Sequence, residues 1–159
     1  MIIKNILICG GSYGLGYEIA KNFLDEDKYN VIIISRKKHK LQSAKKKIKS
    51  KKLDYFVCDL SNENKVIGLM KILKRKYKTI DLVVSTAGAS NMIGTGKENY
   101  KEWLRAFNSN FFLHTNTIES FVKFFKSKKL KKIILISSIA AHFKGGAPLS
   151  YSLAKNSLN

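Results

Sequence analysis

The sequence predicts an α/β fold built on a doubly wound parallel sheet. Short apolar runs alternate with helical patterns along the whole chain. A glycine-rich turn directly follows the first apolar run, where folds of this class bend from a strand into a helix. The composition, 45% hydrophobic with a single proline, suits a globular chain with one core. We therefore expect one domain over residues 1–159.

Each expected element has its own pattern. Strands are expected at residues 2–9, 31–35, 53–58, 80–85 and 133–137, and the fourth is nearly all apolar, as in strands covered on both faces. Helices are expected at residues 14–25, 37–52, 66–77, 103–126 with a break near Asn110, and from Leu149 onward. Strands that alternate with helices form parallel sheets with right-handed crossovers. We expect a Rossmann-type fold that the end of the chain truncates after five strands.

The glycine turn is the first candidate binding site. Gly10, Gly14 and Gly16 stand in the spacing G-x3-G-x-G, between the first strand and the first helix. There, backbone N–H groups and the positive end of the helix dipole can face a pyrophosphate. The alternative is a turn that only connects the two elements. Its place between a strand and a helix favours phosphate binding, and therefore a dinucleotide.

The ends of the second and third strands concern the adenosine part of such a ligand. An acidic residue after the second strand would bond the ribose hydroxyls of NAD. Ser35 and Arg36 instead leave room for a 2′-phosphate and supply a guanidinium to hold it. This favours NADP over NAD, the alternative being an exposed arginine without a ligand. Asp59 is a candidate adenine contact, or else the N-terminal cap of the next helix.

Ser138, Tyr151 and Lys155 form the pattern S-x12-Y-x3-K. A tyrosine and a lysine four residues apart lie on one face of a helix. The positive charge of the lysine then favours the phenolate form of the tyrosine. A tyrosine tuned in this way can donate or accept a proton near neutral pH, so this pattern predicts acid/base chemistry.

Together these motifs resemble the short-chain dehydrogenase/reductase superfamily over the whole chain. The family's T-G-x3-G-x-G stands here as Cys9-Gly10-Gly11-Ser12-Tyr13-Gly14-Leu15-Gly16, and its N-N-A-G as Ser85-Thr86-Ala87-Gly88. Its helix asparagine matches Asn110, which follows Trp103, and its serine, tyrosine and lysine match Ser138, Tyr151 and Lys155. Three residues depart from the family, since Cys9 replaces a threonine and Ser85 and Thr86 replace asparagines.

The resemblance implies an NADP-dependent oxidoreductase that transfers a hydride between its cofactor and a carbonyl/alcohol substrate. Tyr151 would be the general acid/base, and Lys155 would support it and hold the nicotinamide ribose. Ser138 would bond the substrate oxygen, and Asn110 would hold a water that relays protons. The implied cofactor contacts are Gly10, Ser12, Tyr13, Gly14, Leu15, Gly16, Ser35, Arg36, Asp59, Leu60, Ala87, Gly88, Tyr151 and Lys155.

Members of this family continue well past the tyrosine–lysine pair, whereas this chain stops four residues after Lys155. We therefore expect an incomplete cofactor-binding domain that has the adenosine half of the site, with Lys155 in a weakly held last turn. The resemblance implies homo-oligomers only for a full-length form. The alternative function is a non-catalytic nucleotide-binding remnant. The substrate would be a small molecule, and the loop at residues 89–99 points to no particular chemistry for it.

The net charge of +19 comes almost wholly from lysine, since the only arginines are Arg36, Arg75 and Arg105. Nucleic-acid readers usually use arginine and interleaved aromatic residues. The densest basic stretch, residues 37–52, contains no Phe, Trp or Tyr. It predicts a solvated helix face rather than a specific nucleic-acid site. A basic anion-binding or nucleic-acid-binding domain on the same fold is a further alternative.

The remaining observations concern location. No apolar stretch approaches the length that crosses a bilayer, so we expect no membrane partner. Cys9 and Cys58 each end a predicted strand and are expected as buried free thiols. Free thiols suit a reducing compartment, which favours the cytoplasm. No metal site is expected.

Overall fold

The computed structural model describes residues 4–89, 98–126, 132–143 and 146–159 and contains a five-stranded parallel sheet. The strands stand in the order β3-β2-β1-β4-β5. Their bounds are β1 (Asn5–Cys9), β2 (Asn30–Ser35), β3 (Leu53–Val57), β4 (Leu82–Ser85) and β5 (Lys132–Leu135). The order reverses between β1 and β4, and folds of this kind bind ligands beside such a reversal. The expected doubly wound α/β fold is confirmed.

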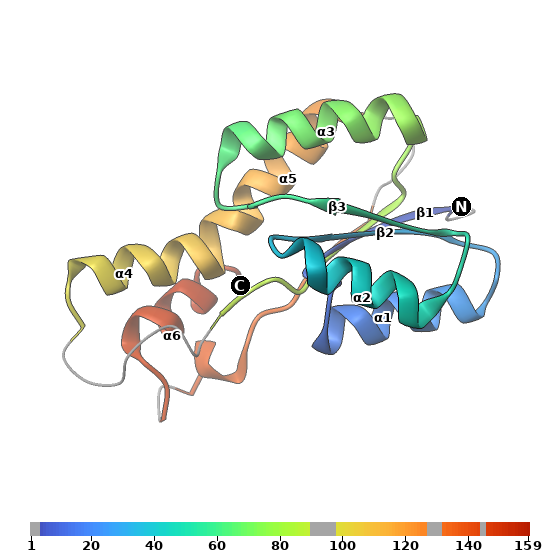
Figure 1. Cartoon of the computed structure of the whole chain (residues 1–159). Helices are drawn as coiled ribbons and strands as arrows, with labels where there is room; N and C mark the ends of the chain where they lie inside the picture. The colour runs from blue at the N-terminus through green and yellow to red at the C-terminus, as the bar shows by residue number, and fades with distance from the viewer. Residues whose placement is uncertain (1–3, 90–97, 127–131, 144–145) are drawn as a thin grey trace.

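Two pairs of helices cover the two faces of the sheet (Figure 1). Helices α1 (Gly14–Asp25) and α2 (Lys38–Ile48) lie on one face, and α3 (Glu63–Tyr77) and α5 (Leu113–Phe124) lie on the other. Side chains of a strand point to alternate faces, so each strand supplies both cores. In β1, Ile6 and Ile8 pack with α1 and α2, while Leu7 and Cys9 pack with α3 and α5. All four are fully buried.

Helices α4 (Tyr100–Phe107) and α6 (Leu149–Asn156) lie beyond the carboxyl ends of the strands (Figure 1). The predicted break near Asn110 is confirmed, because a π-helical turn (Asn108–Phe112) separates α4 from α5. Single π turns inside helices often occur at functional sites. Residues 139–141 form a short 3₁₀ turn before α6.

Helix α2 confirms the expected solvated lysine face, since Leu41 and Ala44 are buried on one side and Lys46 and Lys47 are exposed on the other. The remaining differences from the predicted elements are at their ends. The expected first strand begins at Asn5, and residues 1–3 lie outside the described residues. Most of the predicted substrate loop, residues 90–97, also lies outside them.

Candidate functional site

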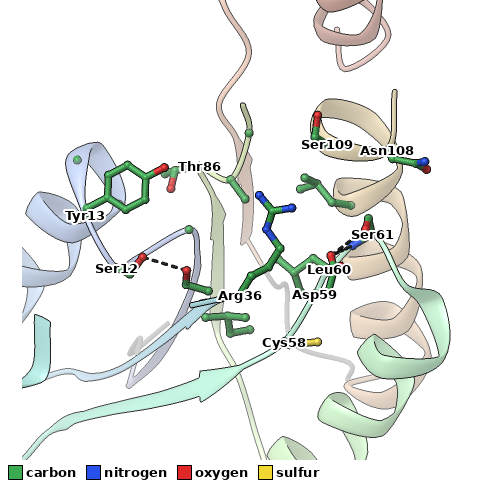
Figure 2. Close-up of a pocket in the computed structure, with 18 of the residues that line it drawn as sticks. Ser12, Tyr13, Arg36, Cys58, Asp59, Leu60, Ser61, Thr86, Asn108 and Ser109 are labelled. Carbon is green, nitrogen blue, oxygen red and sulfur yellow. Dashed lines mark hydrogen bonds between the residues drawn. The ribbon is translucent and has the colours of Figure 1, made fainter. Parts of the chain in front are cut away.

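A cavity of about 590 Å³ opens where β1, β2, β3 and β4 end, between the start of α1 and helix α4. Figure 2 shows side chains of these elements around one space. The cavity is lined by every predicted cofactor residue outside the catalytic pattern: Gly10, Ser12, Tyr13, Gly14, Leu15, Gly16, Ser35, Arg36, Asp59, Leu60, Ala87 and Gly88. Segments that are distant in sequence thus share one site, as expected where parallel strands end at one edge.

The three glycines of the turn have different physical roles. A Cβ atom on Gly16 would lie 2.5 Å from the carbonyl oxygen of Gly10 and 2.5 Å from Thr86 Oγ1. A Cβ on Gly10 would lie 2.8 Å from the backbone nitrogen of Ala87. Gly14 has a φ of +60° and faces open space, with nothing within 4 Å of a Cβ there. Gly10 and Gly16 therefore permit close packing, while Gly14 leaves its side of the cavity free for a ligand.

The first turn of α1 has the features that suit an anion. The helix begins at Gly14, its N-cap residue Tyr13 makes no side-chain cap bond, and its first turn has no acidic residue. The first backbone N–H groups of a helix have no partner within the helix, and the helix dipole adds positive potential there. Because Gly14, Leu15 and Gly16 line the cavity, these groups can serve a phosphate in it.

The end of β2 is tied to the glycine turn. Ser12 Oγ donates a hydrogen bond of 3.0 Å to Ser35 Oγ. The next residue, Arg36, is exposed, and its side chain extends into the cavity (Figure 2). The serine therefore anchors the strand end, and the arginine presents a guanidinium to the cavity.

Asp59 lines the cavity but does not cap the following helix. Its Oδ1 accepts hydrogen bonds from the N–H of Ser61 at 3.1 Å and from Ser61 Oγ at 2.7 Å. The cap of α3 is Asn62, whose Oδ1 accepts from the N–H of Lys65 at 3.1 Å. The alternative interpretation of Asp59 as the helix cap is therefore wrong, because α3 begins at Glu63 and its cap is the residue directly before it.

Tyr151 and Lys155 lie one turn apart on α6. Tyr151 is half-buried, whereas Lys155 is only 4% exposed. Lys155 Nζ donates a hydrogen bond of 2.9 Å to the carbonyl oxygen of Ile136, and burial lowers the pKa of Lys155. Its own carbonyl accepts from Ser137 Oγ at 3.1 Å. The expectation of a weakly held lysine is wrong, because residues that follow β5 bond both its side chain and its backbone.

The start of α6 is also anchored by a distant residue. Its N-cap position is Pro148, which makes no side-chain cap bond. Glu98 takes over this role, since its carboxylate accepts hydrogen bonds from the N–H of Ser150 at 3.1 Å and from the Ser150 hydroxyl. Ser150 directly precedes Tyr151, so Glu98 helps to position the tyrosine.

Asn110 lies in the π turn, and Ser138 directly precedes the 3₁₀ turn. Asn110 is fully buried in the π turn, where its Oδ1 accepts from the N–H of Ala89 and its Nδ2 donates to the carbonyl of Ala89, each at 3.0 Å. Ser138 is half-buried and caps the 3₁₀ turn by accepting from the N–H of Ala140 at 3.2 Å. The side-chain amide of Asn110 thus holds the backbone of Ala89, four residues after the end of β4.

Gly88 connects the cavity to these residues. A Cβ on Gly88 would lie 2.9 Å from Asn110 Oδ1 and 3.4 Å from Lys155 Nζ. Gly88, Asn110 and Lys155 therefore meet at one point. Asn110, Ser138, Tyr151 and Lys155 themselves are not among the residues that line the described cavity. Of the predicted catalytic residues, Asn110 and Lys155 therefore lie next to the cavity, at Gly88.

Known proteins with this architecture identify the family. A sequence model of the short chain dehydrogenase family matches residues 4–159. The chain belongs to the short-chain dehydrogenase family. A benzil reductase ((S)-benzoin forming) of Saccharomyces cerevisiae is 26% identical over 98% of this chain, which spans 62% of that enzyme. The chain spans 60% to 61% of two further curated short-chain dehydrogenase reductases, from Arabidopsis thaliana.

Solved structures of other proteins share the fold. An aldohexose dehydrogenase of Thermoplasma acidophilum superposes with a TM-score of 0.82 at 23% identity, over 98% of this chain and 57% of its own. A variant of actinorhodin polyketide ketoreductase with NADPH gives a TM-score of 0.87 at 20% identity, over 98% of this chain and 61% of its own.

Two of the residues that depart from the family motifs make hydrogen bonds to residues distant in the sequence. Thr86, in place of an asparagine, donates its N–H and its hydroxyl to the carbonyl of Cys9, each at 2.9 Å. Thr86 therefore holds the end of β1, directly before the glycine turn. Ser85, in place of the other asparagine, lies 2.7 Å from Nδ1 of His114 on α5.

His114 is a residue that the sequence did not single out. It is fully buried, and its Nε2 has no hydrogen-bond partner within the described part of the chain. Burial, assisted by the nearby charge of Lys155, lowers the pKa of His114 to about 4, against a smaller opposite effect of the Ala87 backbone. The imidazole is therefore neutral at neutral pH.

One wall of the cavity also escaped the sequence interpretation. Lys101, Leu104 and Arg105 of α4 line it, together with Asn108 of the π turn. Their spacing of three and four residues predicts a common helix face. Periodicity alone does not say that this face meets a cavity.

Other predicted features have simpler outcomes. Cys9 and Cys58 are buried and unpaired, as expected. Burial raises the pKa of Cys9 to about 12 and that of Cys58 to about 11, so both are protonated thiols. Among the described residues, no helix has both the length and the apolar character that crossing a membrane requires.

Proposed function

We propose that this protein is an NADP-dependent oxidoreductase that transfers a hydride between its cofactor and a small carbonyl/alcohol substrate. One observation carries the proposal: a single cavity combines an uncapped helix N-terminus, a glycine turn in which Gly14 faces open space, and the guanidinium of Arg36. The first two features suit a pyrophosphate. The third suits a 2′-phosphate, which distinguishes NADP from NAD.

An NADP molecule in this cavity would have contacts along its length. The pyrophosphate would lie on the N–H groups at Gly14–Gly16, over the open space beside Gly14. Ser35 and Arg36 would meet the phosphorylated ribose, and Asp59 and Leu60 would border the adenine. The nicotinamide end would extend past Gly88 toward α6.

The chemistry belongs to residues next to the cavity. When bound, the cofactor supplies or accepts the hydride. In carbonyl reduction, Tyr151 would donate its hydroxyl proton to the substrate oxygen as the hydride reaches the carbonyl carbon, and Ser138 would donate a hydrogen bond to that oxygen. The ammonium of Lys155 would stabilise the phenolate left on Tyr151. Oxidation of an alcohol reverses these steps.

Asn110 would contribute to proton relay through its place in the π turn rather than through its side chain. Its side-chain amide is engaged with Ala89 and with the carbonyl of Ala106. Because this amide is already engaged, a water at this position would need another acceptor in the π turn. We propose that a main-chain carbonyl there, rather than the side chain, holds the water that relays protons.

Titration of both cofactors by fluorescence tests the proposal. NADPH should bind more tightly than NADH, and the double variant Ser35→Asp/Arg36→Leu should reverse the preference because it replaces the cation with an acid that bonds ribose hydroxyls. Equal affinities in the unmodified chain would count against the assignment. Tighter binding of NADH would overturn it.

A second candidate function is nucleotide binding without turnover. It is favoured by the lining of the cavity. This lining includes every contact predicted for the adenosine part of the cofactor and none of the four predicted catalytic residues. The two functions differ in a simple assay of NADPH oxidation with a panel of ketones. Binding of NADPH without oxidation by a protein of the relatives' full length would favour this second function.

The proposed location is the cytoplasm, supported by the two buried thiols, which persist in reducing compartments. Homo-oligomers remain a proposal for a longer form of the protein. Size-exclusion chromatography with light scattering would test that proposal.

A further inference from the structure

The ring of Tyr13 holds a lysine beside the cavity. Tyr13 stands in the glycine turn, lines the cavity (Figure 2) and is 63% exposed. The Nζ atom of Lys40, in the first turn of α2, lies 4.2 Å from the centroid of this ring. A cation is attracted to the face of an aromatic ring when it lies within about 6 Å of the centroid. The ring therefore keeps the ammonium of Lys40 next to a residue of the cavity wall.

A hydrogen bond ties this ring to the strand end that carries Arg36. Tyr13 follows Ser12, whose Oγ donates a bond of 3.0 Å to Ser35 Oγ. Arg36 directly follows Ser35 and extends into the cavity (Figure 2). Consecutive Cα atoms are about 3.8 Å apart, so Tyr13 and Arg36 each stand one residue from an end of this bond. The residue that holds Lys40 and the predicted phosphate ligand thus belong to neighbouring parts of one wall.

The start of α2 is an unfavourable place for a cation. Its N-cap residue, Lys37, makes no side-chain cap bond, and its first turn contains no acidic residue. The positive end of the helix dipole lies there, whereas cations stabilise the opposite end of a helix. Among the ion pairs of the described residues, none includes Lys40. Because contact with an aromatic ring is weak at an exposed site, the ammonium of Lys40 can leave Tyr13 for an anion.

A 2′-phosphate has more charge than Arg36 alone can balance. A phosphate monoester carries a charge of about −1.5 to −2 near neutral pH, and a guanidinium supplies one positive charge. The stem of a lysine is flexible, and its ammonium has three donors. Rotation of this stem can carry the ammonium of Lys40 from the ring to a phosphate held by Arg36.

We propose that Lys40 is a specificity-determining residue that supplies a second cation to the 2′-phosphate of the cofactor, and that the ring of Tyr13 positions it. The inference rests on the proposed function and deepens it. The sequence motifs place the choice between NADP and NAD at Ser35 and Arg36, at the end of β2. Here the glycine turn and the first turn of α2 take part in that choice.

Two adenosine nucleotides test the inference on the 159-residue chain. The probe 2′,5′-ADP carries the 2′-phosphate, and 5′-AMP lacks it. Calorimetry compares Lys40→Gln with the control Lys47→Gln, which removes the same charge from an exposed position in the last turn of the same helix. Lys40→Gln should weaken binding of 2′,5′-ADP about fivefold or more, the effect of losing a charge-assisted contact, and should change binding of 5′-AMP by less than about twofold. The control should bind both probes as the unmodified chain does.

A second set of variants tests the role of the ring. Tyr13→Leu removes the aromatic face, so it should lower the ratio of 2′,5′-ADP affinity to 5′-AMP affinity, which a merely structural role of the ring would not change. Adding Lys40→Gln to Tyr13→Leu should lower this ratio little further, because both changes remove the same ammonium from the phosphate. Lys40→Arg keeps the charge, the helix propensity and the attraction to the ring, and should restore most of the ratio.

The other outcomes overturn the inference. Equal losses in Lys40→Gln and the control would assign the effect to net charge. Equal losses of both nucleotides, or unchanged binding, would remove Lys40 from the 2′-phosphate, and fully additive effects of the two changes would separate it from the ring.

The unmodified chain distinguishes this inference from the proposed function. If it bound neither nucleotide, or bound both equally, the proposed function itself would fail. If it preferred 2′,5′-ADP and Lys40→Gln kept that preference, only the role of Lys40 would be lost. Circular dichroism checks the fold, and the thermal midpoint of Lys40→Gln should be unchanged or slightly higher, because a cation leaves the first turn of a helix.

Discussion

The buried pair of Ser85 and His114 should make the stability of this protein depend on pH. The pKa of His114 falls from 6.5 to about 4 in the folded protein, chiefly because burial disfavours the charged imidazolium. The unfolded chain therefore binds this proton more readily than the folded one. The stabilisation is complete above pH 6.5 and is lost as the pH falls toward 4.

The magnitude follows from the difference between the two pKa values. At about 1.4 kcal/mol for each pH unit, the fall from 6.5 to about 4 corresponds to about 3 kcal/mol. About 2 kcal/mol of this should already be lost at pH 5. That is a large share of the net stability of about 5–15 kcal/mol that is typical of natural proteins.

Urea unfolding followed by the fluorescence of Trp103, at about pH 7.5 and about pH 5, measures the effect. The matched double variant His114→Leu/Ser85→Ala removes the imidazole and its hydroxyl partner together, so it should lose most of this pH dependence. The control variant His39→Gln changes an exposed histidine of α2 and should retain the pH dependence of the unmodified protein. Equal stability of the unmodified protein at the two pH values, or an unchanged pH dependence in the double variant, would refute the reasoning.

Three further predictions concern other residues. Gly16→Ala should destabilise the fold by about 1–3 kcal/mol and weaken NADPH binding, because its Cβ would meet backbone and Thr86 at 2.5 Å. The control Gly68→Ala, in α3 with open space around it, should instead stabilise by about 0.5–1 kcal/mol in the same thermal and urea assays. Glu98→Gln should cost about 1 kcal/mol by weakening the cap of α6, and a thermal midpoint equal to that of the unmodified protein would contradict this. Tyr151→Phe, in a protein of the relatives' full length, should keep NADPH affinity and lose carbonyl reduction by orders of magnitude, and a retained rate would remove the mechanism.

Local patterns in the sequence predicted the order of the elements and the residues from the strand ends and the glycine turn that line the cavity. Helix α1 has the predicted bounds, Gly14–Asp25, because its apolar side chains recur at helical spacing after a glycine turn. The predicted cofactor residues meet in the cavity because each follows a parallel strand and such strands end at one edge of a sheet. Their positions after strands that were predicted to be parallel were enough to bring them together.

Two predictions failed where local information was insufficient. Asp59 seemed a possible cap from its place before a helix, but Asn62 caps α3, and Asp59 lies in a turn with Ser61. Lys155 was expected to be weakly held because it stands near the end of the chain. Its bonds to Ile136 and Ser137 come from the segment after β5, which the sequence near α6 does not reveal.

The sequence by itself determined which residues share a strand end or a helix face, because the periods of strands and helices are local properties of the backbone. Only the tertiary structure decided what those faces meet. Thr86 packs against Gly16, Ser85 reaches His114, and Glu98 caps the helix that carries Tyr151. Each pair joins residues that are far apart in the chain, and its contact depends on how β4, α4, α5 and α6 pack around the carboxyl ends of the strands.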